Sequence, residues 1–286
     1  MKIGHLPLPH FALPWPNTET HPALCADGFT RPSSARALLD ERRAVREMAA
    51  LMRDPVFRGT GAPAGDGRPV MLIPGFGTGD ISMTLLSRWL ARNGWATVPS
   101  RVHLNIGCAR QTMDHLVRRA ELVALSHGAP VTLIGHSLGG VFAKAVAVRR
   151  PEVVSAVVTL GSPLLAPTAA HRILLADVAM LTALSRFGVG RLGARRIGTG
   201  RPGSNSLMAS DCVRGECAHA AWQELHAPFP TRVAFTSVYS RSDGLIDWHA
   251  CLDPAAEAVE VESSHCGMAV NAAVYRALAV RLGAAA

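Results

Sequence analysis

Residues 131–140 read VTLIGHSLGG, in which four apolar residues lead into a serine held between glycines. The apolar run is typical of a central strand that is buried on both faces of a sheet. Residues 135–139 match the pattern G-x-S-x-G, in which a tight turn from strand to helix lifts a serine hydroxyl above a parallel sheet. Glycines beside the serine give the backbone room for that turn. We therefore predict an α/β fold with Ser137 as the candidate nucleophile.

The chain around this stretch alternates between short apolar runs and helical patterns. The apolar runs are 70–73, 96–99, 131–134, 153–160, 231–239 and 259–261. The helical patterns are 81–93, 110–126, 138–149 and 269–282. Strands that alternate with helices of this length are joined by right-handed crossovers. The alternation predicts a mostly parallel sheet covered by helices on both faces.

The domain organisation follows from two interruptions of this alternation. A glycine-rich stretch, 58–69, separates an N-terminal extension (1–60) from the main domain (61–286). Between the fourth and fifth predicted strands, residues 164–229 carry no strand pattern, and we expect them to form a helical cap over the serine. The chain has 286 residues, of which 49% are hydrophobic, so it is long enough for one such domain with a large core.

The N-terminal extension contains one predicted amphipathic helix. Ser33 or Ser34 offers its N-cap, and the helix stops before Pro55. Its predicted apolar face consists of Leu38, Val45, Met48 and Met52. Packing of such a face on a neighbouring element is the commoner arrangement, and contact with a membrane surface is the alternative.

The composition argues against several classes of protein. The net charge is +8, but no block rich in lysine and arginine carries interleaved aromatic residues, so no nucleic-acid partner is expected. No run of 18 uncharged apolar residues is present, and no transmembrane segment is predicted. Four prolines, Pro7, Pro9, Pro14 and Pro16, interrupt the apolar core that a signal peptide would need. The sequence thus predicts a protein of the cytoplasm or of a membrane periphery.

The six cysteines suggest neither a metal site nor a defined disulfide framework. The spacing of Cys212, Cys217 and His219 fits no common set of zinc ligands, so the sequence implies no metal and no cofactor. Cys251 and Cys266 lie in two loops that are expected to approach each other, and the sequence leaves open whether they are bridged.

A serine hydroxyl becomes a nucleophile only when a base removes its proton, and the base needs an orienting acid. In a fold of this kind the acid and then the histidine follow the serine, each in a loop after a later strand. Asp243 follows the fifth apolar run, and His265 follows the sixth. Asp247 is the rival acid, but Asp243 is nearer to the strand end and precedes a glycine that lets the loop turn inward. His136 is expected to pack or to donate a hydrogen bond rather than to act as the base.

The backbone supplies the expected donors for a developing oxyanion. The loop after the first predicted strand reads PGFGTG (74–79), and its glycines let the backbone approach a bound carbonyl closely. Phe76 N–H is the candidate donor from this loop. Leu138 N–H, at the start of the helix after the serine, is the second candidate.

Five motifs in this order resemble the α/β-hydrolase superfamily, and within it the bacterial lipase and esterase-like branch. They are PGFGTG (74–79), LIGHSLGG (133–140), VVTLGSP (157–163), YSRSDGLIDW (239–248) and SSHCGMAVN (263–271). The resemblance runs from about Pro69 to Leu282. It implies a Ser137–His265–Asp243 triad that works without a cofactor and cleaves carboxylic esters through an acyl-enzyme. Two departures bear on the substrate: Pro74 replaces a histidine that many lipases carry, and Gly161-Ser162-Pro163 differs from the Thr-Pro-His of many relatives.

Several alternatives stay open at this point. An acyltransferase or a thioesterase would use the same triad, and a non-catalytic binding protein could keep the fold. The expected partner is a small acyl ester or a lipid. Within the predicted cap, an apolar segment (173–184) adjoins a stretch (178–210) that has five arginines and no acidic residue. This suits contact with an anionic membrane surface, although a cap packed on the sheet with solvated arginines explains it equally well. Acyl chain length, alcohol group, oligomeric state and the role of the N-terminal helix are not determined by the sequence.

Overall fold

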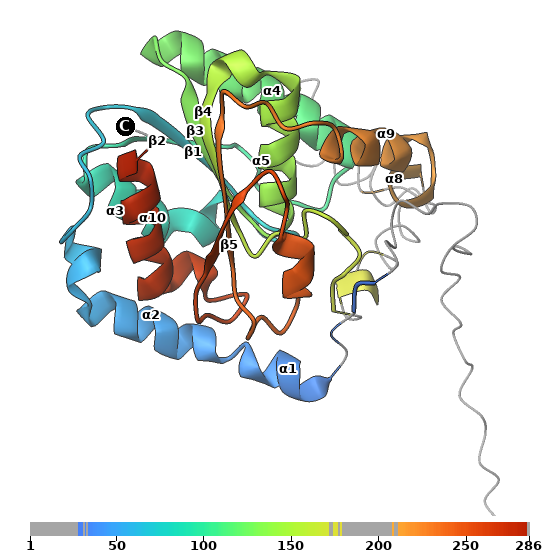
Figure 1. The fold of residues 1–286 in the computed structure, drawn as a ribbon, viewed down its shortest axis with the longest axis horizontal. Coiled ribbons are helices and arrows are strands. Elements are labelled where there is room, and N and C mark those ends of the chain that lie inside the picture. The colour runs from blue at the N-terminus through green and yellow to red at the C-terminus, as the bar shows by residue number, and fades with distance from the viewer. Residues whose placement is uncertain are drawn as a thin grey trace, which may run out of the picture.

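The architecture is a parallel sheet between two layers of helices (Figure 1). This computed structural model describes residues 28–30, 32, 34–171, 174–176, 178, 208 and 211–284. The six strands are β1 (Pro69–Ile73), β2 (Ala96–Pro99), β3 (Val131–His136), β4 (Val154–Leu160), β5 (Ala234–Tyr239) and β6 (Glu257–Glu260). Their order is β2-β1-β3-β4-β5-β6, and every neighbouring pair is parallel. The predicted parallel α/β sheet is therefore confirmed.

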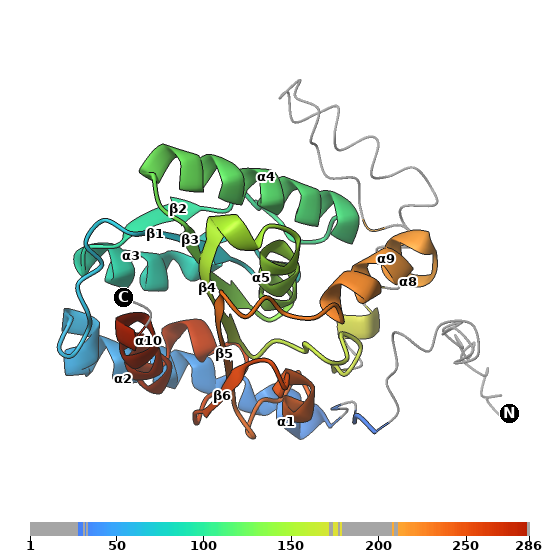
Figure 2. The same ribbon diagram turned by 45° about the horizontal axis from the view of Figure 1, so that its top comes forward.

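The helices divide between the two faces of the sheet. They are α1 (Ala35–Asp40), α2 (Arg43–Arg53), α3 (Thr84–Arg92), α4 (Ala109–His127), α5 (Leu138–Arg149), α8 (Asp211–Arg214), α9 (Glu216–Leu225) and α10 (Ala272–Ala284), with short 3-10 helices η2 (Pro55–Arg58), η3 (Asp80–Met83), η4 (Pro151–Val153), η5 (Trp248–Cys251) and η6 (Met268–Val270). Helices α3 and α10 lie on one side of the sheet, and α4 and α5 on the other (Figures 1 and 2). Of the helices described, none is both long and apolar enough to cross a membrane.

The alternation of side chains along β1 explains why helices are needed on both faces. Val70 and Leu72 join the core formed with α3 and α10, whereas Met71 and Ile73 join the core formed with α4 and α5. All five residues of β1 are buried. A strand that is apolar on both sides loses solvent contact only when both faces are covered. Because the strands are parallel, their carboxyl ends meet at one edge, where ligands bind in such sheets.

The N-terminal extension forms two helices instead of the single helix predicted from the sequence. Ser34 Oγ caps α1 by accepting a hydrogen bond from Ala37 N–H at 3.1 Å. The helix is interrupted at Glu41 and Arg42, and α2 begins at Arg43. At the interruption the Glu41 side chain turns into the main domain, where it is only 8% exposed. Its hydrogen bonds to backbone N–H groups there compensate for the lost helical continuity.

The predicted apolar face of this segment is also wrong in part. Val45 is 67% exposed and Met52 is 52% exposed, whereas Leu51 has no exposed surface. The inward side carries Leu51 together with two glutamates, Glu41 and Glu47, that bind backbone groups of the main domain. Periodicity of apolar residues predicted a different face because it cannot register buried carboxylates that find donors in distant loops.

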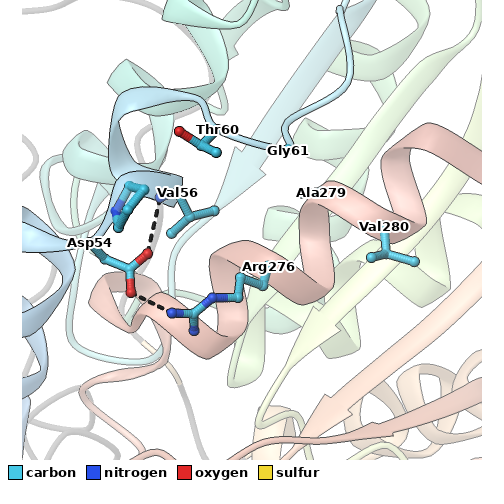
Figure 3. Close-up of a pocket in the computed structure, with 8 residues that line it drawn as sticks. Asp54, Val56, Thr60, Gly61, Arg276, Ala279 and Val280 are labelled. Atoms are coloured by element: carbon cyan, nitrogen blue, oxygen red, sulfur yellow. Dashed lines mark hydrogen bonds and ion pairs between the residues drawn. The ribbon is translucent and has the colours of Figure 1, made fainter.

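The extension is anchored to the C-terminal helix and to α3. Val56 of η2 accepts a hydrogen bond from Trp89 Nε1 at 2.7 Å, and it packs in the same core as Leu51. Asp54 accepts a hydrogen bond from Val56 N–H at 3.0 Å and forms an ion pair with Arg276 of α10. Figure 3 shows this pair beside a surface pocket between η2 and α10. The described part of the extension is thus part of the packed core.

Part of the predicted cap lies beyond the structure that is described. The basic stretch (178–210) and the apolar segment (173–184) lie outside the described residues except for 174–176, 178 and 208. Where the chain is described again, α9 packs against α4 and α5, and Arg149 pairs with Glu224 and Asp114 at 2.7 Å each. The cap over the serine therefore stays a prediction.

Two adjacent residues of α2 test which side of this helix contributes to the stability of the core. Leu51→Ala should lower the free energy of unfolding by about 2–5 kcal/mol, because it leaves a cavity among α3 and α10 side chains. Met52→Ala should change it by less than about 0.5 kcal/mol, because that side chain is exposed. Urea denaturation followed by circular dichroism measures both. Equal losses in the two variants would contradict this packing.

Candidate active site

Ser137 occupies the turn between β3 and α5 in a strained conformation. Its φ is 53° and its ψ is −123°, in the positive-φ region that non-glycine residues rarely adopt. The neighbouring chain holds it there: Ser137 N–H donates to Leu160 O of β4 at 2.8 Å, and Gly140 N–H donates to Ser137 O at 3.0 Å. The residue is 7% exposed. The serine is therefore held in one orientation at the carboxyl edge of the sheet.

Glycines beside the serine are required by close backbone contacts. A Cβ on Gly139 would lie 2.2 Å from Ile73 O, and a Cβ on Gly135 would lie 2.4 Å from Gly139 O. Real Cβ atoms do not approach backbone atoms so closely, so any side chain at either position would push β1, β3 and α5 apart. The two glycines therefore allow the turn between β3 and α5 to pack closely against β1.

The loop 74–79 passes directly beside the serine. A Cβ on Gly75 would lie 3.2 Å from Ser137 Cβ. Phe76 N–H and Leu138 N–H, the two donors expected from the sequence, have no hydrogen-bond acceptor among the described residues. Their role as oxyanion donors stays a prediction.

Asn105, which carries no recognisable sequence signal, holds this loop in place. Its side-chain Nδ2 donates to Pro74 O at 2.9 Å. Its backbone N–H donates to Thr78 O at 2.7 Å, and its carbonyl accepts from Gly77 N–H at 3.0 Å. Asn105 is 2% exposed. It lies in an irregular segment without a motif, so no sequence signal indicated this role.

Asp243 and His265 form a buried hydrogen-bonded pair. His265 Nδ1–H donates to Asp243 Oδ2 at 2.7 Å. The other carboxylate oxygen accepts from Leu245 N–H and Ile246 N–H, each at 2.8 Å, which orients the acid. A proton on Nδ1 leaves Nε2 unprotonated in the neutral ring, so Nε2 is able to accept a proton. The structure thus brings the predicted acid and base into contact.

The electrostatic surroundings favour the protonated form of His265. Burial by itself lowers the pKa of this histidine, but the charge of Asp243, its hydrogen bond and the charge of Glu41 outweigh that effect. The pKa of His265 is consequently raised above its usual value. An imidazolium formed during a reaction would be stabilised by the two carboxylates.

Asp247, the rival acid, has a different set of partners. Its carboxylate accepts from Thr30 N–H at 2.6 Å and from Thr30 Oγ1 at 2.8 Å. The other oxygen contacts His249 Nδ1 at 2.7 Å and caps η5. These contacts join residue 30 to the loop after β5, so Asp247 has a structural role.

His136 precedes Ser137 in the chain and contacts His265. Its Nε2–H donates to His265 O at 3.0 Å, and the centroids of the two rings are 4.9 Å apart. Burial, followed by the proximity of His265, lowers the pKa of His136 to about 4, so this ring is neutral at physiological pH. The expectation that His136 donates a hydrogen bond is confirmed. The His265 ring bonds Asp243 through Nδ1, and no hydrogen bond joins it to the Ser137 side chain among the described residues.

Glu41 binds the acid loop and the histidine loop at the same time. Its Oε1 accepts from Gly244 N–H at 2.9 Å and from His265 N–H at 3.0 Å. Its Oε2 accepts from Cys266 N–H at 2.8 Å. A carboxylate that accepts three backbone hydrogen bonds is well compensated for its burial. The N-terminal extension therefore fixes the spacing between the loops that carry Asp243 and His265.

Glu47, in α2, also supports the histidine loop. Its Oε1 accepts from Ser264 N–H at 2.8 Å, and its Oε2 accepts from Ser263 Oγ at 3.0 Å. Neither glutamate stands out in the sequence, because acidic residues on a surface helix are usually solvated. Their partners are more than 200 residues away along the chain, with a separation of 217 from Glu47 to Ser264.

The cysteines in the two loops are not bridged. Cys251 is buried and Cys266 is exposed, and no disulfide joins them. The question that the sequence left open is thereby answered for these two residues. His219, considered as a zinc ligand with Cys212 and Cys217, instead contacts Gln223 Nε2 through its own Nε2 at 2.9 Å.

The charge of Glu41 can be tested through His265. In Glu41→Gln the pKa of His265 should fall, because one of the charges that raise it has been removed. Titration of the His265 ring by NMR measures this change. Asp247→Asn is the matched control and should leave the pKa of His265 in place, since that carboxylate contacts Thr30 and His249. An unchanged pKa in Glu41→Gln would show that the carboxylate does not act on the histidine.

Comparisons with known proteins agree with this fold. A family model described as alpha/beta hydrolase fold matches residues 70–242. No curated protein sequence matches the chain. Among solved structures, the mature lipase BlEst2 of Bacillus licheniformis is similar with a TM-score of 0.51 and 14% identity, over 77% of this chain and 94% of that one.

Two further solved structures show the same similarity. A soluble variant of the monoglyceride lipase from Saccharomyces cerevisiae has a TM-score of 0.53 and 16% identity, over 78% of this chain and 90% of that one. The monoacylglycerol lipase of Paleococcus ferrophilus has a TM-score of 0.52 and 15% identity, over 79% and 97%. At such identities the likeness concerns the fold.

Proposed function

Because the chain belongs to the α/β-hydrolase fold family, we propose that it is a serine hydrolase that cleaves carboxylic esters. The observation that carries the proposal is the buried hydrogen bond between His265 and Asp243, 2.7 Å long, at the sheet edge where Ser137 is held in its strained turn. Nucleophile, acid and base (Ser137, Asp243 and His265) follow one another along the chain in the order that this fold uses. The substrate class is an acyl ester, including ester lipids.

The first half of the reaction forms an acyl-enzyme. His265 Nε2 takes the proton of Ser137 Oγ as the oxygen attacks the ester carbonyl. Phe76 N–H and Leu138 N–H donate hydrogen bonds to the oxyanion of the tetrahedral intermediate. His265 then gives its proton to the leaving alcohol, and the C–O bond to the alcohol breaks. The hydrogen bond between Ser137 and His265 closes in the substrate complex, as is common for sites that are loose without ligand.

The second half returns the enzyme to its starting state. A water molecule loses a proton to His265 Nε2 and attacks the acyl carbon. The serine leaves and regains the proton from His265, and a carboxylic acid is released. Throughout, Asp243 stabilises the imidazolium and keeps Nδ1 protonated, which is consistent with the raised pKa of His265.

Removal of the nucleophile tests the central claim. Ser137→Ala should lower the hydrolysis of nitrophenyl esters on the order of 10⁶-fold, as in comparable triads, with the circular dichroism spectrum unchanged. Acyl chains from short to long should be compared in the same assay, because the chain-length optimum reports the substrate class. Equal turnover by wild type and variant would contradict the role of Ser137 as the nucleophile. Acyl transfer to an added alcohol without release of acid would favour a transferase.

The two candidate acids provide a matched pair for a second test. Asp243→Asn should lower kcat about 10⁴-fold, because the histidine loses the partner that selects its tautomer. Asp247→Asn should retain kcat within a few-fold, because Asp247 contacts Thr30 and His249 rather than His265. Reversal of the two effects would assign the acid to Asp247.

The pH dependence of kcat/KM has a predicted sign. The base works only when it is deprotonated, so activity should rise as the pH increases through the pKa of His265. Because this pKa is raised, the midpoint should lie above the ordinary histidine value of about 6.5. In Asp243→Asn the midpoint of the residual activity should move to lower pH. A midpoint that stays in place in this variant would exclude His265 as the titrating base.

A further inference from the structure

Three cysteines from two distant parts of the chain meet near the carboxyl edge of the sheet. Cys108 is the N-cap residue of α4, Cys212 lies in α8, and Cys217 lies in the first turn of α9. Their sulfur atoms all lie within 4.8 Å of one another. Cys108 Sγ and Cys217 Sγ are 3.5 Å apart, although the residues are separated by 109 positions in the sequence. The sequence did not suggest this cluster because Cys108 is far from the other two cysteines.

The sulfur separations suit a shared metal ion. Zinc binds thiolate sulfur at about 2.3 Å, so two sulfurs of a tetrahedral site lie about 3.8 Å apart. The spacing of 3.5 Å and the upper limit of 4.8 Å bracket that value. A disulfide needs about 2.05 Å between two sulfurs and has no place for a third. The arrangement of the three sulfurs therefore fits three ligands of one metal ion.

The cluster lies where two helices begin. Cys108 and Cys217 both sit at the beginnings of helices, α4 with 19 residues and α9 with 10. Backbone N–H groups at such ends stabilise negative sulfur. Cys217 is buried, whereas Cys108 and Cys212 are half-buried, so the cluster has one side towards solvent. His219 is engaged with Gln223 and stands outside the group of three.

We propose that Cys108, Cys212 and Cys217 bind one Zn²⁺ ion through three thiolates, with a water molecule as the fourth ligand. On binding, the three sulfurs lose their protons to solvent, and no oxidation takes place. Thiolate ligands select zinc over hard cations such as Mg²⁺ and Ca²⁺. The proposal is independent of the ester chemistry at Ser137.

The position of the ion suggests what it stabilises. It would join the start of α4 to α8 and α9, where the chain returns from the predicted cap. Close by, Met208 N–H donates to Ile106 O at 3.0 Å, and Ile106 adjoins Asn105, which holds the loop of Phe76. Zinc would thus fix the returning chain to the segment that positions an oxyanion donor. The expected role is structural, with an effect on the stability of this corner of the molecule.

Metal binding by the full chain tests the proposal. The reduced protein, freed of metal with a chelator, is titrated with Zn²⁺ against a chromogenic competitor, and with Co²⁺ as a spectroscopic probe. Wild type should bind one Zn²⁺ per chain, and the Co²⁺ form should show thiolate-to-metal charge transfer with tetrahedral d–d bands. Cys108→Ser and Cys217→Ser should each weaken Zn²⁺ binding by at least about tenfold, since a lost ligand should cost no less than a lost supporting contact.

Cys266→Ser is the matched control, because Cys266 is an exposed cysteine outside the cluster. It should bind Zn²⁺ as wild type does. Equal affinity in all four proteins, or a Co²⁺ spectrum without charge-transfer bands, would overturn the proposal. If the cysteine variants fail to fold, the wild-type Co²⁺ spectrum decides alone. A reduced wild type that forms a Cys108–Cys217 disulfide in air but binds no Zn²⁺ would equally refute the site.

Discussion

The backbone of Ser137 is the constraint around which the edge of the sheet is arranged. A positive φ at a serine persists only when its neighbours hold it, and here β4 accepts its N–H while α5 starts at the next residue. The crossing is so close that Gly135 and Gly139 have no room for a Cβ. Since β1, β3 and α5 meet at this point, a change in the turn would disturb the sheet as well as the serine.

The parallel register of the sheet brings the remaining groups to the same edge. The loops after β1, β3, β5 and β6 carry Phe76, Ser137, Asp243 and His265, in that order. Because the strands are parallel, these loops lie at the same edge of the sheet although they are far apart in the sequence. The fine spacing is then set by polar contacts to the backbone: Asn105 fixes the loop of Phe76, and Glu41 fixes the loops of Asp243 and His265.

The role of Glu41 links the N-terminal extension to the site. Its carboxylate replaces water for three backbone N–H groups and adds negative charge near His265, which raises the pKa of that histidine together with Asp243. Burial of a carboxylate without such donors would be costly, so the buried position of Glu41 between α1 and α2 depends on the N–H groups of both loops. Folding of the extension and order at the site are therefore coupled.

The sequence by itself determined the fold class, the strand order along the chain and the residue types at the sheet edge. Local patterns suffice for these features: apolar runs of strand length, glycines around Ser137, and Asp243 and His265 directly after strands. The tertiary structure alone decided which side of α2 faces inward, how Asn105, Glu41 and Glu47 support the loops, and that Cys108 meets Cys212 and Cys217. These features depend on hydrogen bonds and contacts between segments up to more than 200 residues apart. A local pattern cannot encode them, because whether a polar side chain is buried is set by the partner that folding brings to it.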